Sequence, residues 1–128
     1  MQDLSRLLRP KSIAVIGGGM WCRSVVEQCK KFGFTGDLWP VHPEAKEIGE
    51  LPAFSSVNKL PHSPDAAFIG VNRHATIKVV QSLSARHSGG AVCFASGFLE
   101  AQAEDEGGAK LQKLLLSAAG EMPIIGPN

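Results

Sequence analysis

Apolar positions along this chain follow two alternating patterns, one typical of buried strands and the other of amphipathic helices. Unbroken apolar runs, most of them rich in β-branched residues, occupy residues 12–17, 38–41, 66–71, 91–94 and 124–125. Such runs predict strands buried on both faces, as in parallel sheets. A weaker segment at residues 51–54 predicts a short edge strand, followed by a turn of helix near residues 57–60.

The segments between these strands carry apolar residues at helical spacing. This spacing predicts helices over residues 21–32, closed by Gly33, over residues 75–86, and over residues 111–118, ending near Gly120. Residues 100–108 are polar and predict a loop or the frayed start of the last helix. Because alternating strands and helices form right-handed βαβ units, we predict a Rossmann-like α/β fold. It would be a doubly wound parallel sheet in a single domain, residues 1–128.

Composition and charge narrow the classes of function. The chain has 128 residues, of which 44% are hydrophobic and 20% are charged, as in ordinary globular domains. The chain has thirteen Lys and Arg residues and twelve Asp and Glu residues, which gives a net charge of +1 with His neutral. Without a basic excess, a general nucleic-acid or membrane-surface partner is not expected. The sequence shows no signal peptide and no apolar run of membrane-spanning length, and we predict a cytoplasmic protein.

Catalytic and metal-binding groups are not evident in the sequence. Cys22, Cys29 and Cys93 are too scattered for a zinc cluster, and we expect them to be reduced thiols. Ser96 lies outside a Gly-x-Ser-x-Gly elbow and is not expected to be a nucleophile. No carboxylate pair or catalytic triad stands out. We therefore predict no catalytic and no metal-ligating residue in this chain.

Three successive glycines follow the first predicted strand. Gly17, Gly18 and Gly19 open the next helix, where a phosphate can approach the backbone N–H groups at the positive end of the helix dipole. Chain reversal alone does not need three glycines, so the turn favours phosphate binding. Cys22 replaces the third glycine of the dinucleotide motif, and the second strand ends at Val41 without the acid that binds the NAD ribose. A phosphorylated ligand other than NAD is therefore expected.

Polar side chains near other strand ends are further candidates. Ligands of open parallel sheets bind where the strand order reverses, and we expect the strands ending at Gly17 and Val71 to be neighbours there. Cations in this region can meet phosphates or be ordinary surface charges, and histidines can hydrogen-bond a ligand or serve the fold. The cations are Arg23, Lys46 and Arg73, and the histidines are His42 and His74. Trp21 and Trp39 are expected to be packing residues.

Eight short segments recur in the order of a known family. They lie at residues 7–17, 33–36, 39–43, 51–54, 60–61, 64–65, 96–100 and 125–128. Each segment is weak alone, and together they are specific. The whole chain resembles the N-terminal CoA-binding domain of NDP-forming acyl-CoA synthetases, which are related to the α subunit of succinyl-CoA synthetase.

The resemblance implies that CoA is the ligand. In this family the first glycine turn binds a CoA phosphate, and the segment after the second strand contacts the nucleotide end. The tips of the two following strands complete the site. With Arg23 added as a nearby cation, the predicted contacts are Gly17, Gly18, Gly19, Met20, Arg23, His42, Pro43, Lys46, Val71, Asn72, Arg73, Ala95, Ser96, Gly97 and Phe98.

The same resemblance implies a role within a larger enzyme. The family's phosphorylated histidine and nucleotide-grasp domain lie beyond the Gly-Pro-Asn motif at residues 126–128, so the chain resembles one domain of an NDP-forming acid–CoA ligase. Its shorter glycine turn, and residues 71–74 in place of a Val-Pro type sequence, indicate a subfamily. A stand-alone regulatory CoA-binding protein remains an alternative, and an NAD(P)-binding oxidoreductase domain is a less favoured one.

Overall fold

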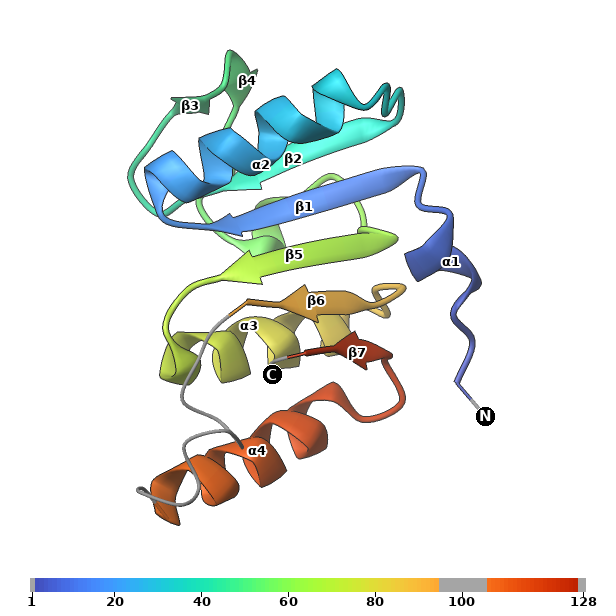
Figure 1. Cartoon of the computed structure of the whole chain (residues 1–128), viewed down its shortest axis with the longest axis vertical. Helices are drawn as coiled ribbons and strands as arrows, with labels where there is room; N and C mark the ends of the chain where they lie inside the picture. The colour runs from blue at the N-terminus through green and yellow to red at the C-terminus, as the bar shows by residue number, and fades with distance from the viewer. Residues whose placement is uncertain (1, 95–105, 127–128) are drawn as a thin grey trace.

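A five-stranded parallel sheet forms the centre of the computed structural model, which describes residues 2–94 and 106–126 (Figure 1). The strand order is β2-β1-β5-β6-β7. The strands are β1 (Ser12–Gly17), β2 (Asp37–Val41), β5 (Ala66–Gly70), β6 (Ala91–Cys93) and β7 (Ile124–Ile125). The helices are α1 (Ser5–Leu8), α2 (Gly19–Lys31), α3 (Arg73–Ala85) and α4 (Glu106–Ala119), with a 3₁₀ turn η1 (Val57–Lys59). The predicted Rossmann-like fold is confirmed.

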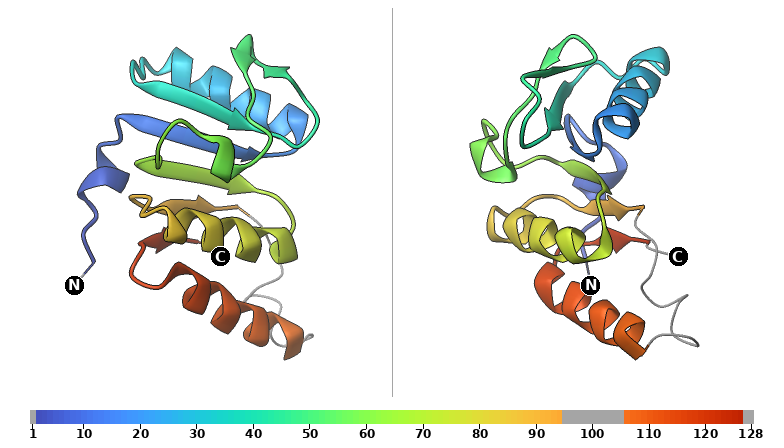
Figure 2. Two further views of the ribbon diagram at one scale, coloured as in Figure 1. Left: turned by 180° about the vertical axis from the view of Figure 1, so that it is seen from behind. Right: turned by 90° about the vertical axis from the view of Figure 1, so that its left-hand side faces the viewer.

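Helices cover the sheet from both sides (Figure 2). On one face, Ile13 and Val15 of β1 pack in a cluster with Val26 of α2. On the other face, Ala14 and Ile16 belong to a cluster that includes residues of α3 and α4. Every residue of β1 is buried, as expected for a strand between two layers.

The strand order reverses at β1. The chain passes from β1 through α2 to β2 on one side of β1, and β5 then pairs with β1 on the other side. Gly17 and Gly70 are register partners at the carboxyl ends of β1 and β5. The neighbouring strand ends expected from the sequence are therefore present, with β5 ending one residue earlier than predicted.

Two predicted segments take a different form. Leu51–Pro52 is strand β4 of a separate antiparallel pair with β3 (Glu47–Ile48), and is not an edge strand of the main sheet. Phe54 forms an isolated bridge to Val41, because its N–H donates to the Pro40 carbonyl at 2.9 Å. Local apolar pattern does not determine such pairings, since they depend on where the loop returns to the sheet.

Helix and strand ends also shift. Helix α3 begins at Arg73, two residues before the predicted start, because the Asn72 side chain accepts the Ala75 N–H at 2.8 Å and caps it. Strand β6 ends at Cys93, and α1 was not predicted. Helix α4 starts at Glu106, inside the segment predicted as polar loop or frayed helix, while residues 100–105 lie outside the described ranges. Within residues 2–94 and 106–126, no helix combines the length and apolarity needed to cross a bilayer.

A polar cluster holds the amino end of the sheet beside α1. Arg6 donates from Nε to Asp65 Oδ1 at 2.7 Å, and the Lys11 N–H donates to Asp65 Oδ2 at 2.8 Å. The Asp65 N–H in turn donates to Ser12 Oγ at 3.0 Å. Burial alone would raise the pKa of Asp65, but these hydrogen bonds and the nearby positive charges hold that pKa below its usual value. The loop before β5 is thereby tied to the start of β1.

Candidate ligand-binding site

The glycine turn joins β1 to α2 at the carboxyl end of the sheet. Gly17 is buried at the end of β1, and Gly18 is the extended N-cap of α2, with φ −62° and ψ 148°. The Cys22 N–H donates to the Gly18 carbonyl at 2.8 Å, so helical bonding starts immediately. No side chain of the described residues caps this terminus. The first-turn N–H groups therefore lack a partner among the described side chains at the positive end of the helix dipole, where an anion can be bound.

Neither the space around the second and third glycines nor their backbone conformation requires glycine. A Cβ added at Gly18 or Gly19 would have no described atom within 4 Å, and neither residue has a positive φ. Both residues are exposed. The missing side chains therefore leave the helix terminus open to an approaching group, which supports the predicted phosphate contact.

A cavity of about 260 Å³ lies beside this turn, on the α3 side of the sheet. Three predicted site residues line it: Gly17, Pro43 and Val71. The sequence analysis missed its polar lining, which consists of Ser55, Ser56, Asn58, Lys78 and Ser82. Lys78 and Ser82 lie one helical turn apart on α3, a spacing that also occurs on ordinary exposed helix faces, so the sequence carried no distinctive signal for them.

His42 organises the loop after β2. Its backbone N–H donates to the Phe54 carbonyl at 2.9 Å, and its Nδ1 accepts the N–H groups of Glu44 at 3.1 Å and Ala45 at 3.0 Å. A nitrogen that accepts carries no proton, so these two hydrogen bonds favour the tautomer with the proton on Nε2. Lys46 is exposed in the same loop. Of the two roles left open for His42, the structure shows the one in the fold.

The loop after β5 is held by hydrogen bonds from its own side chains. Asn72 Oδ1 accepts the Ala75 N–H and so caps α3. The buried Thr76 donates from Oγ1 to the Asn72 carbonyl at 2.9 Å. Arg73 is the first residue of α3, and His74 is exposed. The backbone of this strand tip is therefore held by hydrogen bonds within the chain.

Other predicted residues lie apart from this cavity or outside the described ranges. Arg23 Nε lies 3.1 Å from Glu27 Oε1 in an exposed i,i+4 ion pair on α2. Met20 is 90% exposed at the start of that helix. The predicted contacts at residues 95–98 belong to the segment outside the described residues.

Thiols and metal ligands offer no reactive centre in the described part of the chain. Burial raises the pKa of Cys22 and of Cys93 to about 11, and it also raises the pKa of Cys29. These thiols therefore stay protonated near neutral pH, where the thiolate is the nucleophilic form. Among residues 2–94 and 106–126, no three His, Cys, Asp or Glu side chains gather into a metal-binding group.

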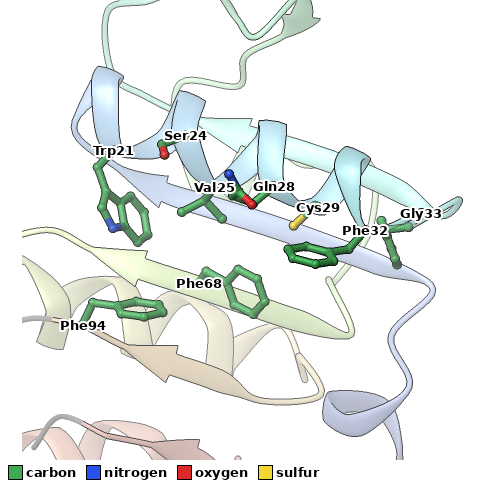
Figure 3. Close-up of a pocket in the computed structure, with 10 residues that line it drawn as sticks. Trp21, Ser24, Val25, Gln28, Cys29, Phe32, Gly33, Phe68 and Phe94 are labelled. Carbon is green, nitrogen blue, oxygen red and sulfur yellow. The ribbon is translucent and has the colours of Figure 1, made fainter.

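A second, apolar groove of about 570 Å³ lies on the opposite, α2 face of the sheet. Figure 3 shows aromatic rings from α2 on one side and from β5 and the residue after β6 on the other. The Trp21 and Phe94 rings lie 5.5 Å apart between centroids, and the Phe68 and Phe94 rings 6.4 Å apart. Among the described residues, no charged side chain lines this groove, so that lining is unfavourable for phosphates.

An open glycine turn at the reversal point of a parallel sheet places the molecule among α/β domains that bind phosphorylated ligands. A family model described as a CoA binding domain matches residues 11–128. The chain belongs to this CoA-binding domain family.

Curated relatives are much longer than this chain. It is 37% identical over 133 residues to a trans-feruloyl-CoA synthase from an unknown prokaryotic organism, covering 99% of this chain and 18% of that protein. It is 36% identical over 132 residues to an ADP-forming acetate–CoA ligase from Archaeoglobus fulgidus, covering 98% of this chain and 19% of that protein. The chain thus spans about a fifth of the length of these relatives and matches one part of them.

Solved structures agree with this assignment. A dinucleotide-forming acetyl-coenzyme A synthetase from Ca. Korarchaeum cryptofilum, in complex with phosphate and ADP, superposes with a TM-score of 0.87 at 29% identity, covering 100% of this chain and 28% of that chain. An NAD⁺ complex of prephenate dehydrogenase from Aquifex aeolicus has a TM-score of 0.64 at 18% identity, covering 88% of this chain and 39% of that chain. The second likeness shows a shared fold alone.

Proposed function

We propose that the chain binds CoA at the carboxyl end of its sheet, as the CoA-binding part of an NDP-forming acyl-CoA synthetase. One observation carries the location of the site: Gly18 and Gly19 leave the α2 terminus open, although neither space nor backbone conformation requires glycine there. A phosphate of CoA would accept hydrogen bonds from the first-turn N–H groups. Family membership supports CoA as the phosphorylated ligand.

The nucleotide end of CoA would lie toward the loop after β2. Pro43 lines the 260 Å³ cavity, and His42 and Lys46 belong to the same loop. This cavity is smaller than the roughly 300–1,000 Å³ of most ligand pockets, so it would hold one portion of CoA. Lys78 brings a positive charge to its lining, which favours a phosphate there. Residues 71–73 and 95–98 remain predicted contacts for the rest of the ligand.

This domain would contribute to the reaction by positioning CoA. An NDP-forming synthetase converts a carboxylic acid, CoA and NTP into acyl-CoA, NDP and phosphate. Holding CoA by its phosphates orients the thiol toward the reacting acyl group, and such positioning lowers the entropic part of the barrier. The partner domains would carry the phosphorylated histidine and the nucleotide-grasp fold. The isolated chain would then bind CoA without forming acyl-CoA from acid and NTP.

Calorimetric titration of the chain with CoA, NADH and ATP tests the ligand assignment. We expect saturable binding of CoA, with NADH and ATP at least tenfold weaker, because β2 ends without an acidic residue for the NAD ribose. Tight NADH binding with no CoA binding would identify a dinucleotide domain instead. CoA binding to a chain that also forms acyl-CoA unaided would identify a complete enzyme.

A further inference from the structure

Two glycines face each other across the ends of β1 and β5. Gly17 and Gly70 are register partners, and alternation along the strands puts both on the same face as Val15 and Phe68. That is the face covered by α2. On this face the two central strands therefore end without side chains, directly beside the proposed CoA phosphate site.

The Trp21 indole occupies the space that these glycines leave. A Cβ at Gly70 would lie 2.7 Å from Cδ2 and Cε2 of Trp21, and a Cβ at Gly17 would lie 2.7 Å from Cζ3. Real Cβ atoms do not approach other heavy atoms so closely, so the ring lies directly against both backbones. Neither glycine has a positive φ, and the contact with Trp21 is the reason that no larger residue fits at Gly70.

The position of Trp21 in α2 connects this contact to the ligand site. Trp21 lies three residues after the N-cap Gly18, within the first turn whose N–H groups are uncapped by described side chains. Its ring reaches across the strand ends to an edge contact with Phe94, as Figure 3 shows. The indole thus stands between the glycine turn and the apolar groove on the α2 face.

We infer that Trp21 is a positioning residue for CoA. Its indole closes the α2 side of the carboxyl edge, so CoA crosses the ends of β1 and β5 on the α3 side, against the 260 Å³ cavity. The same ring braces the first turn of α2 and holds its N–H groups toward the phosphate. This inference rests on the proposed CoA binding, and it adds the side of the sheet on which CoA lies and the residue that decides it.

A double-mutant cycle tests whether the contact between Trp21 and Gly70 supports CoA binding. Gly70→Ala displaces the indole, and Trp21→Ala removes it, so each variant should weaken CoA binding about tenfold. The double variant should be no more than about twofold weaker than Trp21→Ala, because no ring is left to displace. Trp21→Phe should recover most of the affinity by restoring an aromatic ring. All titrations are run at a temperature where circular dichroism shows each variant to be folded.

Chemical protection tests the side on which CoA lies. Lys78 is exposed and lines the cavity on the α3 side, whereas Cys29 lines the groove on the α2 side. Desulfo-CoA, which has no thiol, should slow reductive methylation of Lys78 severalfold and leave maleimide labelling of Cys29 unchanged. In Trp21→Ala the protection of Lys78 should weaken.

The outcomes separate the inference from the function on which it rests. Failure of the unmodified chain to bind CoA would refute the proposed function. If the unmodified chain binds CoA but the losses of affinity in Gly70→Ala and Trp21→Ala add fully in the double variant, Trp21 does not hold the first turn of α2 for the ligand. The proposed CoA binding would stand. Protection of Cys29 in place of Lys78 would put CoA on the α2 face and overturn the assigned side.

Discussion

The amino end of the parallel sheet and the glycine turn at its carboxyl end differ in how their polar groups are satisfied. At the amino end, Asp65 accepts hydrogen bonds from Arg6 and from the Lys11 N–H, and Arg6 also donates to the His87 carbonyl at 2.6 Å. At the carboxyl end, the first turn of α2 has no cap from the described side chains, and Gly18 stands open to solvent. Polar groups are satisfied internally where the fold is tied together, and they are left available where a ligand would satisfy them.

The comparison has an energetic side. A carboxylate that accepts charge-assisted hydrogen bonds contributes to folding, whereas open N–H groups at a helix end contribute only when an anion binds them. Substitutions at the amino end should therefore change the free energy of unfolding, and those in the glycine turn should change CoA affinity. Any variant that alters both quantities strongly would weaken the comparison.

The largest effect is expected at Asp65. Asp65→Ala removes the acceptor for Arg6 and the Lys11 N–H, and should lower the free energy of unfolding by about 2–3 kcal/mol. Urea denaturation measures the change. Asp37→Ala is the matched control, since Asp37 is an exposed carboxylate at the same end of the sheet and should cost less than about 0.5 kcal/mol. CoA affinity of the folded Asp65→Ala protein should stay within about twofold of the unmodified chain.

Acid should remove the same contribution. The pKa of Asp65 is lowered in the folded state, so its stabilisation is fully present above its unfolded pKa of about 3.9 and is lost as the pH falls through the folded value. The stability difference between the unmodified chain and Asp65→Asn should therefore be constant from pH 5 to 7 and shrink below pH 4. A difference that stays unchanged down to pH 2 would show that the charge of Asp65 is not the source of the stabilisation.

At the carboxyl end, Gly18→Val should weaken CoA binding at least tenfold, equivalent to about 1.4 kcal/mol. A branched side chain would obstruct the phosphate, yet a Cβ there meets no described atom within 4 Å and φ is −62°. The melting temperature should therefore change little. Gly18→Ala gives the graded comparison, with a smaller loss of affinity. Unchanged affinity in folded Gly18→Val would show that the glycine turn only reverses the chain.

A smaller effect is expected at Asn72, which belongs to the carboxyl end but serves the fold. Asn72→Ala removes the N-cap of α3 and should lower the free energy of unfolding by about 1 kcal/mol. Asn72→Ser keeps a capping oxygen and should recover most of the loss. If Asn72→Ala weakens CoA binding more than about threefold while the serine variant restores only stability, the amide itself contacts the ligand.

The smallest effect is expected at Arg23. The Glu27 carboxylate offsets part of the positive charge of its guanidinium, and both side chains are exposed, so Arg23→Ala should weaken CoA binding by only about two- to threefold. The loss of the exposed ion pair should cost about 0.3–0.5 kcal/mol of stability. Titration at low and high salt measures the electrostatic share. A loss above tenfold that disappears at high salt would make Arg23 a principal phosphate contact.

Much of the fold follows from local pattern. The buried runs that end at Gly17 and near Gly70 predicted β1 and β5, and alternation of strands with helices predicted the parallel sheet. The glycine turn was visible for the same reason, because chain reversal and phosphate binding both depend on residues adjacent in sequence. Of the residues that line the cavity, Gly17 and Val71 were found as the ends of predicted strands, and Pro43 as part of the segment after one.

Contacts between distant residues were decided by the tertiary structure alone. Arg6 and Asp65 are 59 positions apart, and no periodicity connects them. Lys78 joins Pro43 in one cavity only because η1 and α3 pack on the same face of the sheet. The close contact between the Trp21 ring and Gly70 forms only in the observed register of β1 with β5. That register is selected among all possible strand pairings. Sequence by itself determined which elements form and where the chain turns, because those depend on neighbouring residues. The complete lining of the site and the side closed by Trp21 were decided by tertiary structure, because they depend on how separate elements pack.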